Sequence, residues 1–287
     1  PSSAASDVYK RQVHNKDNSH LSKYIDEMNA LSGIDGWLTE NYTGSVPETD
    51  SRGEGRCFRP KNTRRADAAR DYVDSLTSLD HWEKSTLITS IIRGLDSVDN
   101  TVGVQQAYLK EWCERSNNDI EFELPKCISG PIGIHYEGSC LTNDYRSVDL
   151  AYLDPPYSPH QYSTYYHIWD SVARWDKPET ALKSRRRIDR VAKNSEYDNS
   201  MTSPWNSKNT AGRAFRDLID RLPVRYVLVS YSNESIMPED ELMDICRSFG
   251  QTKISYIDYR RNIMSQIGNA SKDADKKQTN QEWLILI

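Results

Sequence analysis

The chain has 287 residues and carries 37 Lys and Arg against 42 Asp and Glu, a formal net charge of −5. This balance excludes bulk positive charge as the basis of nucleic-acid binding, which would have to come from local basic patches. No apolar run approaches the length of a membrane span and no signal peptide is visible, so we expect neither a membrane protein nor a secreted one. The five cysteines form no CxxC pair and no metal-binding spacing, as expected of reduced thiols in a cytoplasmic protein without a structural metal.

The amino-terminal residues are unusual. Residues 2–12 are similar to the translation of a common transposase-based sequencing adapter, and the first methionine is Met28. Fusion segments of this kind are excluded from fold reasoning. We therefore expect residues 1–12 to be non-native, the native sequence to begin near Val13, and the sequence that preceded it to be lost.

The pattern of apolar residues in the first half of the chain predicts several helices and then one short strand. Apolar residues recur at helical spacing, which predicts helices over 17–31, 62–76, 82–95 and 104–114. A short strand is predicted at 134–136. The region 13–133 is therefore expected to be mainly helical.

An apolar run and an acid–proline turn form the most informative stretch. Val148–Leu153 predicts a buried strand that stops at Asp154, because Pro155 and Pro156 cannot donate to a sheet ladder. Open α/β sheets bind ligands at the carboxyl ends of their strands, where this places Asp154. The carboxylate, the proline carbonyls and the flat ring of Tyr157 suit a planar amine, such as a nucleobase held out of its helix. The alternative is a strand end followed by a proline turn, since short motifs also match by chance.

Beyond this turn the chain alternates between helices and strands. The patterns predict helices over 161–175, 210–221 and 239–249 and strands over 226–230, 252–259 and 283–287. Ser230 and Asn233 follow one of these strands, again at a carboxyl end. His167 lies on the first of these helices, where a structural role is favoured over a role as general base.

A dense basic segment follows the motif. It contains Lys183, Arg185, Arg186, Arg187, Arg190 and Lys193, with Asp189 as its one acid. A charge run is usually a solvated face. Beside a base-sized pocket in an acidic protein, the same run also suits contact with DNA phosphates. Both interpretations stay open.

The motif Asp154-Pro155-Pro156-Tyr157 resembles the catalytic motif of S-adenosylmethionine-dependent enzymes that methylate the exocyclic amine of adenine or cytosine in DNA. Further blocks resemble, in order, those of the class D-twelve adenine-specific DNA methyltransferases, which include the Dam-type enzymes. These blocks are residues 36–42, 62–67, 100–103, 107–110, 152–157, 161–162, 166–167, 174–179 and 230–233. The resemblance runs from Ser22 to Ile287. It implies a Rossmann-like α/β sheet, S-adenosylmethionine as cofactor, adenine in double-stranded DNA of a prokaryote or phage as substrate, and a cognate restriction endonuclease as candidate partner.

The resemblance also implies roles for single residues. The Asp154 carboxylate and the Pro155 carbonyl would accept hydrogen bonds from the amine, localise its lone pair and prepare it to attack the methyl group in line. Pro156 and Tyr157 complete the catalytic set, and the implied cofactor contacts are Ser139, Cys140 and Asp154. The implied DNA contacts are Tyr157, Gln161, Tyr166, Ser230, Asn233, Lys183, Arg185, Arg186, Arg187, Arg190 and Lys193.

Two features depart from the family pattern. The glycine-rich cofactor loop is absent, since no glycine pair follows a buried strand and opens a helix, and Ser139-Cys140 stands where the family usually carries an Asp. We therefore predict an incomplete Rossmann-like methyltransferase sheet that lacks its first strands, with a helical inserted region. The strand 148–153 would then have an unpaired apolar edge. We also expect weak binding of S-adenosylmethionine, which micromolar affinity in a calorimetric titration would contradict.

The predicted organisation has three parts. They are the non-native segment 1–12, the helical region 13–133 as a candidate target-recognition part, and a catalytic region 134–287 with a basic loop at 180–209. Two rival functions are a methyltransferase acting on ribosomal RNA guanine or protein glutamine, and a non-catalytic DNA-binding relative. An Asp rather than an Asn at the head of the motif favours adenine, and the intact motif argues against loss of catalysis.

Overall fold

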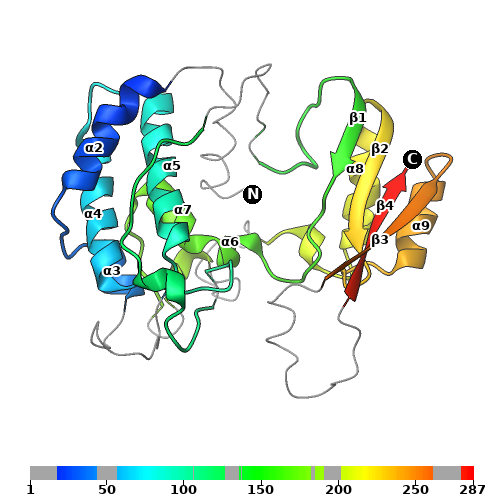
Figure 1. Ribbon diagram of the computed structural model, residues 1–287. Coiled ribbons are helices and arrows are strands. Elements are labelled where there is room, and N and C mark those ends of the chain that lie inside the picture. Colours follow the sequence, from blue (N-terminus) through cyan, green and yellow to red (C-terminus); the bar gives the residue numbers. More distant parts are fainter. Residues whose placement is uncertain are drawn as a thin grey trace. The chain divides into compact units, whose positions relative to one another are not determined.

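The computed structural model describes residues 18–43, 57–105, 107–126, 136, 138–181, 185–190, 202–260 and 279–287. The chain divides into two compact units (Figure 1). Of these residues, 138–161, 202–260 and 279–287 form the sheet unit, and the others form the helical unit. The segment 162–190, which we expected in the catalytic region, therefore groups with the helices. The adapter-like segment, Lys183, Lys193 and most of the strand predicted at 134–136 lie outside the described residues.

The helical unit is built from helices that share one apolar core. Its helices are α2 (Ser22–Ala30), α3 (Trp37–Tyr42), α4 (Pro60–Ser75), α5 (His81–Ser97), α6 (Tyr162–Tyr165) and α7 (His167–Arg174), with 3-10 turns at Ser19–Leu21, Glu114–Asn117 and Ile188–Arg190. α5 begins at a capping box in which Asp80 and Glu83 bond each other's backbone amides. Leu87 and Ile91 of α5 pack into the same core as Ile168 of α7. The helices predicted at 17–31, 62–76 and 82–95 are confirmed with shifted ends, and the helix predicted at 161–175 is divided at Tyr166.

Two local predictions differ from the structure because remote polar side chains determine the backbone. The short helix α3 was not predicted, and the amides of Leu38 and Thr39 at its start donate to the Asp67 carboxylate of α4 at 2.9 and 3.0 Å. The helix predicted over 104–114 is wrong, since the described residues of that range form no α-helix. Instead the Asn100 side chain bonds the Leu109 carbonyl at 3.0 Å and the Cys113 amide at 2.9 Å, and such bonds compete with helical ones. No helix in the described ranges combines the length and apolar character needed to span a bilayer.

The described residues of the sheet unit form four strands in a mixed sheet. They are β1 (Val148–Leu153), β2 (Val224–Ser232), β3 (Lys253–Arg260) and β4 (Thr279–Leu286), in the order β1-β2-β4-β3. β1 and β2 are parallel, and β4 runs antiparallel to both of its neighbours. The helices α8 (Ala211–Arg221) and α9 (Glu239–Arg247) pack on this sheet, where Val229 and Ile285 share a core with Phe215 and Leu242. The strands and helices predicted for this part are confirmed, with ends shifted by a few residues.

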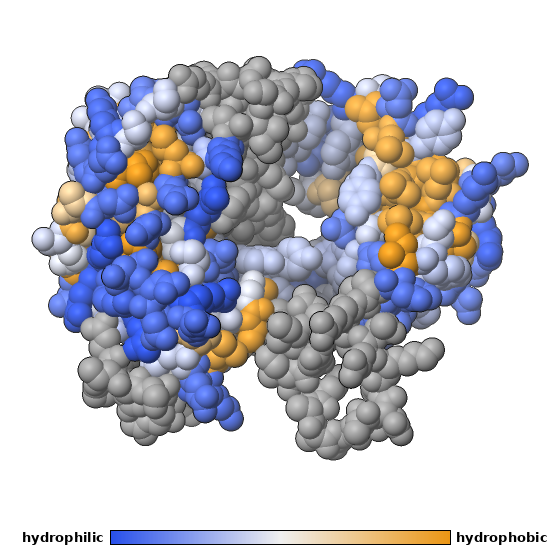
Figure 2. Space-filling model, viewed as in Figure 1, coloured by the Kyte–Doolittle hydropathy of each residue, from blue (hydrophilic) through white to orange (hydrophobic). Residues whose placement is uncertain are grey.

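The other face of the sheet is apolar and exposed. Register places Leu150 opposite Tyr226 and Tyr152 opposite Leu228, which lies opposite Leu286 in turn. Leu150 is 50% exposed and Tyr152 58%, and Figure 2 shows the apolar surface over these strands. Our prediction of a buried strand is therefore wrong: no residue of β1 is buried, and only Ala151 and Leu153 are half-buried, because α8 and α9 cover one face alone. In the described part of the chain, β1 is also an end strand of the sheet.

Candidate active site

Asp154 lies immediately after β1 and is exposed to solvent. The strand ends here because Pro155 and Pro156 have no amide hydrogen to donate. Since β1 and β2 are parallel, their carboxyl ends lie on one edge of the sheet, which brings Asp154 to the same rim as Ser230. The structure thus places this carboxylate on the edge where α/β sheets bind their ligands.

A cavity of about 220 Å³ opens beside the motif. Asp154, Pro155 and Pro156 line one side of it, and the remaining wall is formed by Cys140, Tyr152, Leu153, Trp205, Phe215 and Leu218. Burial raises the pKa of the Cys140 thiol, which keeps this part of the wall uncharged. The cavity therefore offers a carboxylate and two prolines at the mouth of an apolar recess.

Ser139 and Cys140 were expected to contact the cofactor, and the structure separates them. Cys140 lines the cavity, whereas Ser139 is not among the lining residues. Its hydroxyl oxygen accepts the Leu141 amide at 3.2 Å within a turn.

Tyr157 is half-buried, and both its hydroxyl and its ring have contacts within the sheet unit. Its hydroxyl donates to Glu282 Oε1 at 2.7 Å and lies 3.0 Å from the Ser230 hydroxyl. Its ring meets Tyr231 edge-on, with centroids 5.4 Å apart and planes at 83°. Burial is the largest cause and raises the pKa of Tyr157; the hydrogen bond with Ser230 lowers it, and the carboxylates of Glu282 and Asp154 raise it. The phenol is therefore a stable hydrogen-bond donor beside the motif.

The loop after the motif is fixed by amide side chains. The buried Asn206 donates through Nδ2 to the carbonyls of Ser158 and His160 at 2.8 and 2.9 Å. Gln161, an expected DNA contact, accepts the Ser203 amide at 2.9 Å through its side-chain oxygen. Both amides hold the chain around the motif in place, and Gln161 uses its acceptor for that purpose.

Two further expected DNA contacts, Asn233 and Tyr166, have partners within their own units. Asn233 is exposed, and its Oδ1 accepts the Gln281 amide at 3.1 Å, which fastens the end of β2 to β4. Tyr166 belongs to the helical unit, where its ring meets Tyr162 edge-on with centroids 5.9 Å apart.

The basic segment is not uniformly a surface feature. Arg187 is 3% exposed, and its guanidinium bonds Asp176 at 2.6 and 2.9 Å and Asp189 at 3.0 Å. Burial alone would lower the pKa of Arg187, but these two carboxylates raise it above its usual value. The structure therefore gives Arg187 two internal partners instead of a phosphate, because a charge run in sequence does not show which member turns inward. Arg185 and Arg186 are half-buried, and Arg190 ends a 3-10 turn.

His167 is buried and uncharged. Its Nε2 donates to the Gln105 carbonyl at 3.2 Å, and its Nδ1 lies 3.4 Å from the Tyr42 hydroxyl. Burial lowers the pKa of His167 to about 4. This arrangement agrees with the structural role that the sequence favoured.

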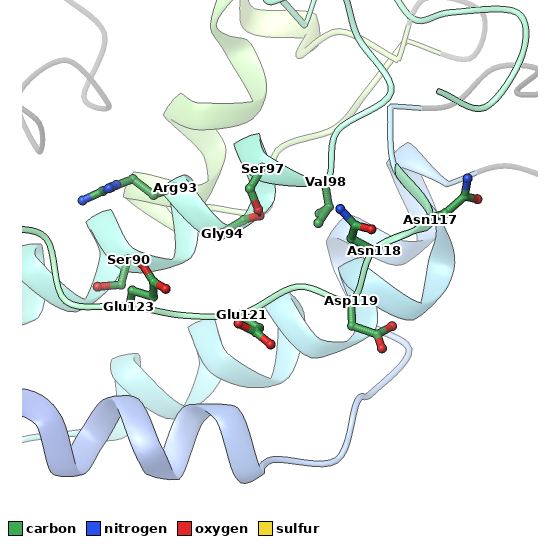
Figure 3. Close-up of a pocket in the computed structure, with 10 residues that line it drawn as sticks. All are labelled: Ser90, Arg93, Gly94, Ser97, Val98, Asn117, Asn118, Asp119, Glu121 and Glu123. Carbon is green, nitrogen blue, oxygen red and sulfur yellow. The ribbon is translucent and has the colours of Figure 1, made fainter. Parts of the chain in front are cut away.

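A larger cavity of about 710 Å³ lies in the helical unit, between α5 and the extended segment 117–123 (Figure 3). Arg93 reaches it from α5, and Asp119, Glu121 and Glu123 reach it from the extended segment. It has no aromatic lining residue on which a base could stack, and its carboxylates would repel phosphate. The motif cavity is therefore the better candidate. Among the described residues, no cluster of His, Cys, Asp or Glu is arranged to hold a metal ion.

Comparison with known proteins identifies the family. The model of the D12 class N6 adenine-specific DNA methyltransferases matches residues 7–245. The chain belongs to this family. The predicted family is thus confirmed, but the match begins inside residues 2–12 and lends no support to the prediction of a non-native segment.

Individual relatives of this D12 chain are modification enzymes. It is 33% identical to Modification methylase LlaI of Lactococcus lactis subsp. lactis over 202 residues, which cover 66% of the chain and 31% of that protein. It is 30% identical to Modification methylase StsI of Streptococcus sanguinis over 233 residues, or 78% of the chain and 34% of that protein. Type II methyltransferase M.NlaIII of Neisseria lactamica is 26% identical over 74% of the chain and 61% of its own length. The chain thus spans about a third of the length of the first two relatives. No solved structure matches it.

Several residues of the candidate site were not found from the sequence. Glu282 and Tyr231 complete the surroundings of Tyr157, and Asn206 fixes the loop behind it. Asn206 follows Trp205 in the polar stretch beyond the basic segment, which is a weak local signal. Glu282 directly precedes the strand predicted at 283–287, so the predicted element did not include it.

Proposed function

We propose that the protein methylates the exocyclic N6 amine of adenine in double-stranded DNA. One observation carries the proposal: an exposed carboxylate, Asp154, stands at the carboxyl edge of the sheet beside two prolines and an aromatic ring with a fixed hydroxyl. Family membership agrees with this assignment. The activity is proposed for the protein as a whole, since the chain spans about a third of its first relatives.

The residues of the motif can prepare a poor nucleophile. The lone pair of the adenine amine is delocalised into the ring, and hydrogen bonds from its two N–H groups to Asp154 and to the Pro155 carbonyl would localise it on nitrogen. The ring of Tyr157 would stack on the base once the base has left the duplex. Positioning and fixed charge of this kind act where the transition state develops charge.

We propose S-adenosylmethionine as the methyl donor, which the family implies. When bound, this group supplies an electrophilic methyl. The described residues do not by themselves build a site for all of it, because the cavity of about 220 Å³ is smaller than the roughly 300 Å³ at which ligand pockets begin. Asp154 is also the one carboxylate among its lining residues, and none remains for a ribose.

We infer that the four strands are part of a Rossmann-like methyltransferase sheet whose first strands would lie beside β1. The parallel pair β1-β2 with ligand-side residues at its carboxyl ends supports this, as does the antiparallel hairpin of β3 and β4. Parallel strands are normally covered on both faces, and the exposed apolar face at β1 lacks such cover in the described residues.

Further parts of the proposal concern partners. Because the motif lies in the sheet unit, we propose that the helical unit contributes to recognition of the target sequence. The names of the relatives favour a cognate restriction endonuclease as a functional partner. Cellular DNA as substrate would place the protein in the cytoplasm of a prokaryote or of a cell infected by a phage.

The decisive test is identification of the methylated product. The product of the complete open reading frame is incubated with labelled S-adenosylmethionine and unmethylated duplex DNA, ribosomal RNA or bacterial protein, and the modified residues are identified by mass spectrometry. We expect N6-methyladenine in DNA, and we expect Asp154→Ala to lower its formation at least about a hundredfold. Methylguanine in RNA or methylglutamine in protein would favour the rival assignments. Binding of DNA without any methylation would favour the non-catalytic one.

A further inference from the structure

Glu282 joins two hydroxyl groups at the rim of the sheet unit. It lies on β4 and is 125 residues from Tyr157 in the sequence. Its Oε1 accepts a hydrogen bond from the Tyr157 hydroxyl at 2.7 Å and another from the Ser230 hydroxyl. The motif loop, the end of β2 and the start of β4 therefore meet at one carboxylate oxygen.

The donor and acceptor groups of this cluster fix the direction in which the Tyr157 hydroxyl donates its hydrogen bond. Each hydroxyl carries a single hydrogen, and an ionised carboxylate can only accept. Glu282 therefore takes the hydrogens of both Tyr157 and Ser230, although the two hydroxyl oxygens are themselves 3.0 Å apart. Bonds of this charge-assisted kind are roughly twice as strong as those between neutral groups.

A second contact fixes the ring. Tyr157 meets Tyr231 edge-on at 83°, and Tyr231 is 1% exposed. The Tyr231 hydroxyl is itself tied, since it accepts the Met237 amide at 3.2 Å. The ring of Tyr157 is thus held along one edge by packing and at its hydroxyl by Glu282, so that its plane is set before any ligand arrives.

The Glu282 side chain is not required to form the sheet. In the strand register Glu282 lies opposite Ser232 on one side and Ile257 on the other, and these pairings use backbone groups. A carboxylate at this position brings a charge into a half-buried site, which is costly unless the charge has partners. Its partners are the hydroxyls of Tyr157 and Ser230.

We propose that Glu282 is a positioning residue for methyl transfer: through the Tyr157 hydroxyl it fixes the ring plane on which the extruded adenine stacks. The inference rests on the proposed function, because it assigns Tyr157 the stacking role. It adds a residue outside the Asp-Pro-Pro-Tyr motif, from the last strand of the chain. Active-site side chains of this kind work best when a surrounding shell locks their rotamers.

The test is a double-mutant cycle in the product of the complete open reading frame. The substrate is a duplex bearing the sequence found methylated in the product assay, with adenine or 2-aminopurine at the target. We expect Glu282→Ala and Tyr157→Phe each to lower kcat/KM about tenfold to a hundredfold. The double variant should lose no more than one single variant, because both changes cut the same link. Glu282→Gln keeps an acceptor oxygen and should recover most of the activity.

The fluorescence of the 2-aminopurine duplex gives a readout that a merely structural role would not move. A stacked 2-aminopurine is quenched, so the bound duplex should be brighter with Glu282→Ala or Tyr157→Phe than with the unsubstituted protein. Tyr256 and Glu239 form a matched control, since they make a tyrosine–carboxylate bond of 2.5 Å on the outer strand of the same unit. Tyr256→Phe and Glu239→Ala should leave both readouts unchanged.

The results of these experiments distinguish a failure of the positioning role from a failure of the proposed function. If the unsubstituted protein methylates adenine but the losses of Glu282→Ala and Tyr157→Phe add up, the positioning role is wrong and the proposed function stands. If the unsubstituted protein makes no N6-methyladenine, both are wrong. Should Glu282→Ala fail to fold, Glu282→Gln in the Tyr157→Phe background replaces it, and any additional loss there counts against the proposal.

Discussion

Each unit holds a cluster of charged and hydroxyl side chains, and the clusters differ in what they leave for a ligand. In the helical unit, the guanidinium of Arg187 bonds Asp176 and Asp189, lies 3.3 Å from the Ser171 hydroxyl, and is almost fully buried. In the sheet unit, Glu282 and Ser230 hold the hydroxyl of Tyr157, whose ring lies beside the exposed Asp154. In the first cluster the guanidinium is bound by side chains of its own unit, whereas the second holds a ring directly after a carboxylate that lines a cavity.

This difference suggests which cluster contributes mainly to stability and which contributes mainly to function. The buried guanidinium of Arg187 has its donors taken up by two carboxylates and a hydroxyl of the same unit, so its loss should lower stability. The rim cluster lies beside an exposed carboxylate on a sheet edge and fixes the geometry of whatever binds there. The comparison predicts that substitutions in the helical unit mainly change unfolding, and that substitutions at the rim mainly change catalysis.

The largest effect on stability is expected from Arg187→Ala. The change leaves the carboxylates of Asp176 and Asp189 without their shared cation and opens a space in the helical unit. Both carboxylates are more than a third exposed and water can solvate them after the change, so we expect the free energy of unfolding to fall by about 2 to 3 kcal/mol. Denaturant unfolding followed by circular dichroism measures this loss.

Arg185→Ala is the control for the Arg187 prediction. Arg185 belongs to the same basic run but is only half-buried, and we expect it to change unfolding by less than about 1 kcal/mol. An Arg187→Ala protein with unchanged stability and weakened DNA binding would restore our first interpretation of Arg187 as a phosphate contact.

The same contrast shows what the sequence could predict. Patterns that depend on near neighbours were informative, and β1 was predicted with the bounds that the structure shows. Features that depend on distant partners could not be predicted from local patterns. A backbone amide at the start of α3 donates to a carboxylate 29 residues away, and the Tyr157 hydroxyl donates to a glutamate 125 residues away. The inward turn of Arg187 has the same cause, since the local sequence shows its charge but not the position of Asp176. The motif itself was recognisable because Asp154 to Tyr157 are contiguous.

A smaller effect, dependent on pH, is expected from His167. The pKa of His167 is lowered by burial to about 4, against about 6.5 in the unfolded chain. Below pH 6.5 the unfolded state binds a proton that the folded state does not, so stability falls as the pH falls from about 6.5 towards 4. The histidine should therefore remove about 2 kcal/mol between pH 7 and pH 5. Thermal unfolding at these two values measures the change.

His167→Gln isolates this contribution. Glutamine does not titrate and keeps a donor for the Gln105 carbonyl, so the variant should lose less stability between pH 7 and pH 5 than the unsubstituted protein. Equal losses in the two proteins would show that other groups cause the acid sensitivity.

The smallest effect on stability is expected at the rim, from Tyr157→Phe. The variant keeps the ring and its edge contact with Tyr231 but removes the donor to Glu282, and we expect the free energy of unfolding to fall by only about 1 kcal/mol. Tyr256→Phe should leave unfolding unchanged, because its bond to Glu239 is exposed. Denaturant unfolding of both variants, set beside their methylation rates, tests the contrast between the units. A Tyr157→Phe protein as unstable as Arg187→Ala would mean that the rim cluster holds the fold together, and a reduced rate of methylation could then no longer be assigned to the position of the ring.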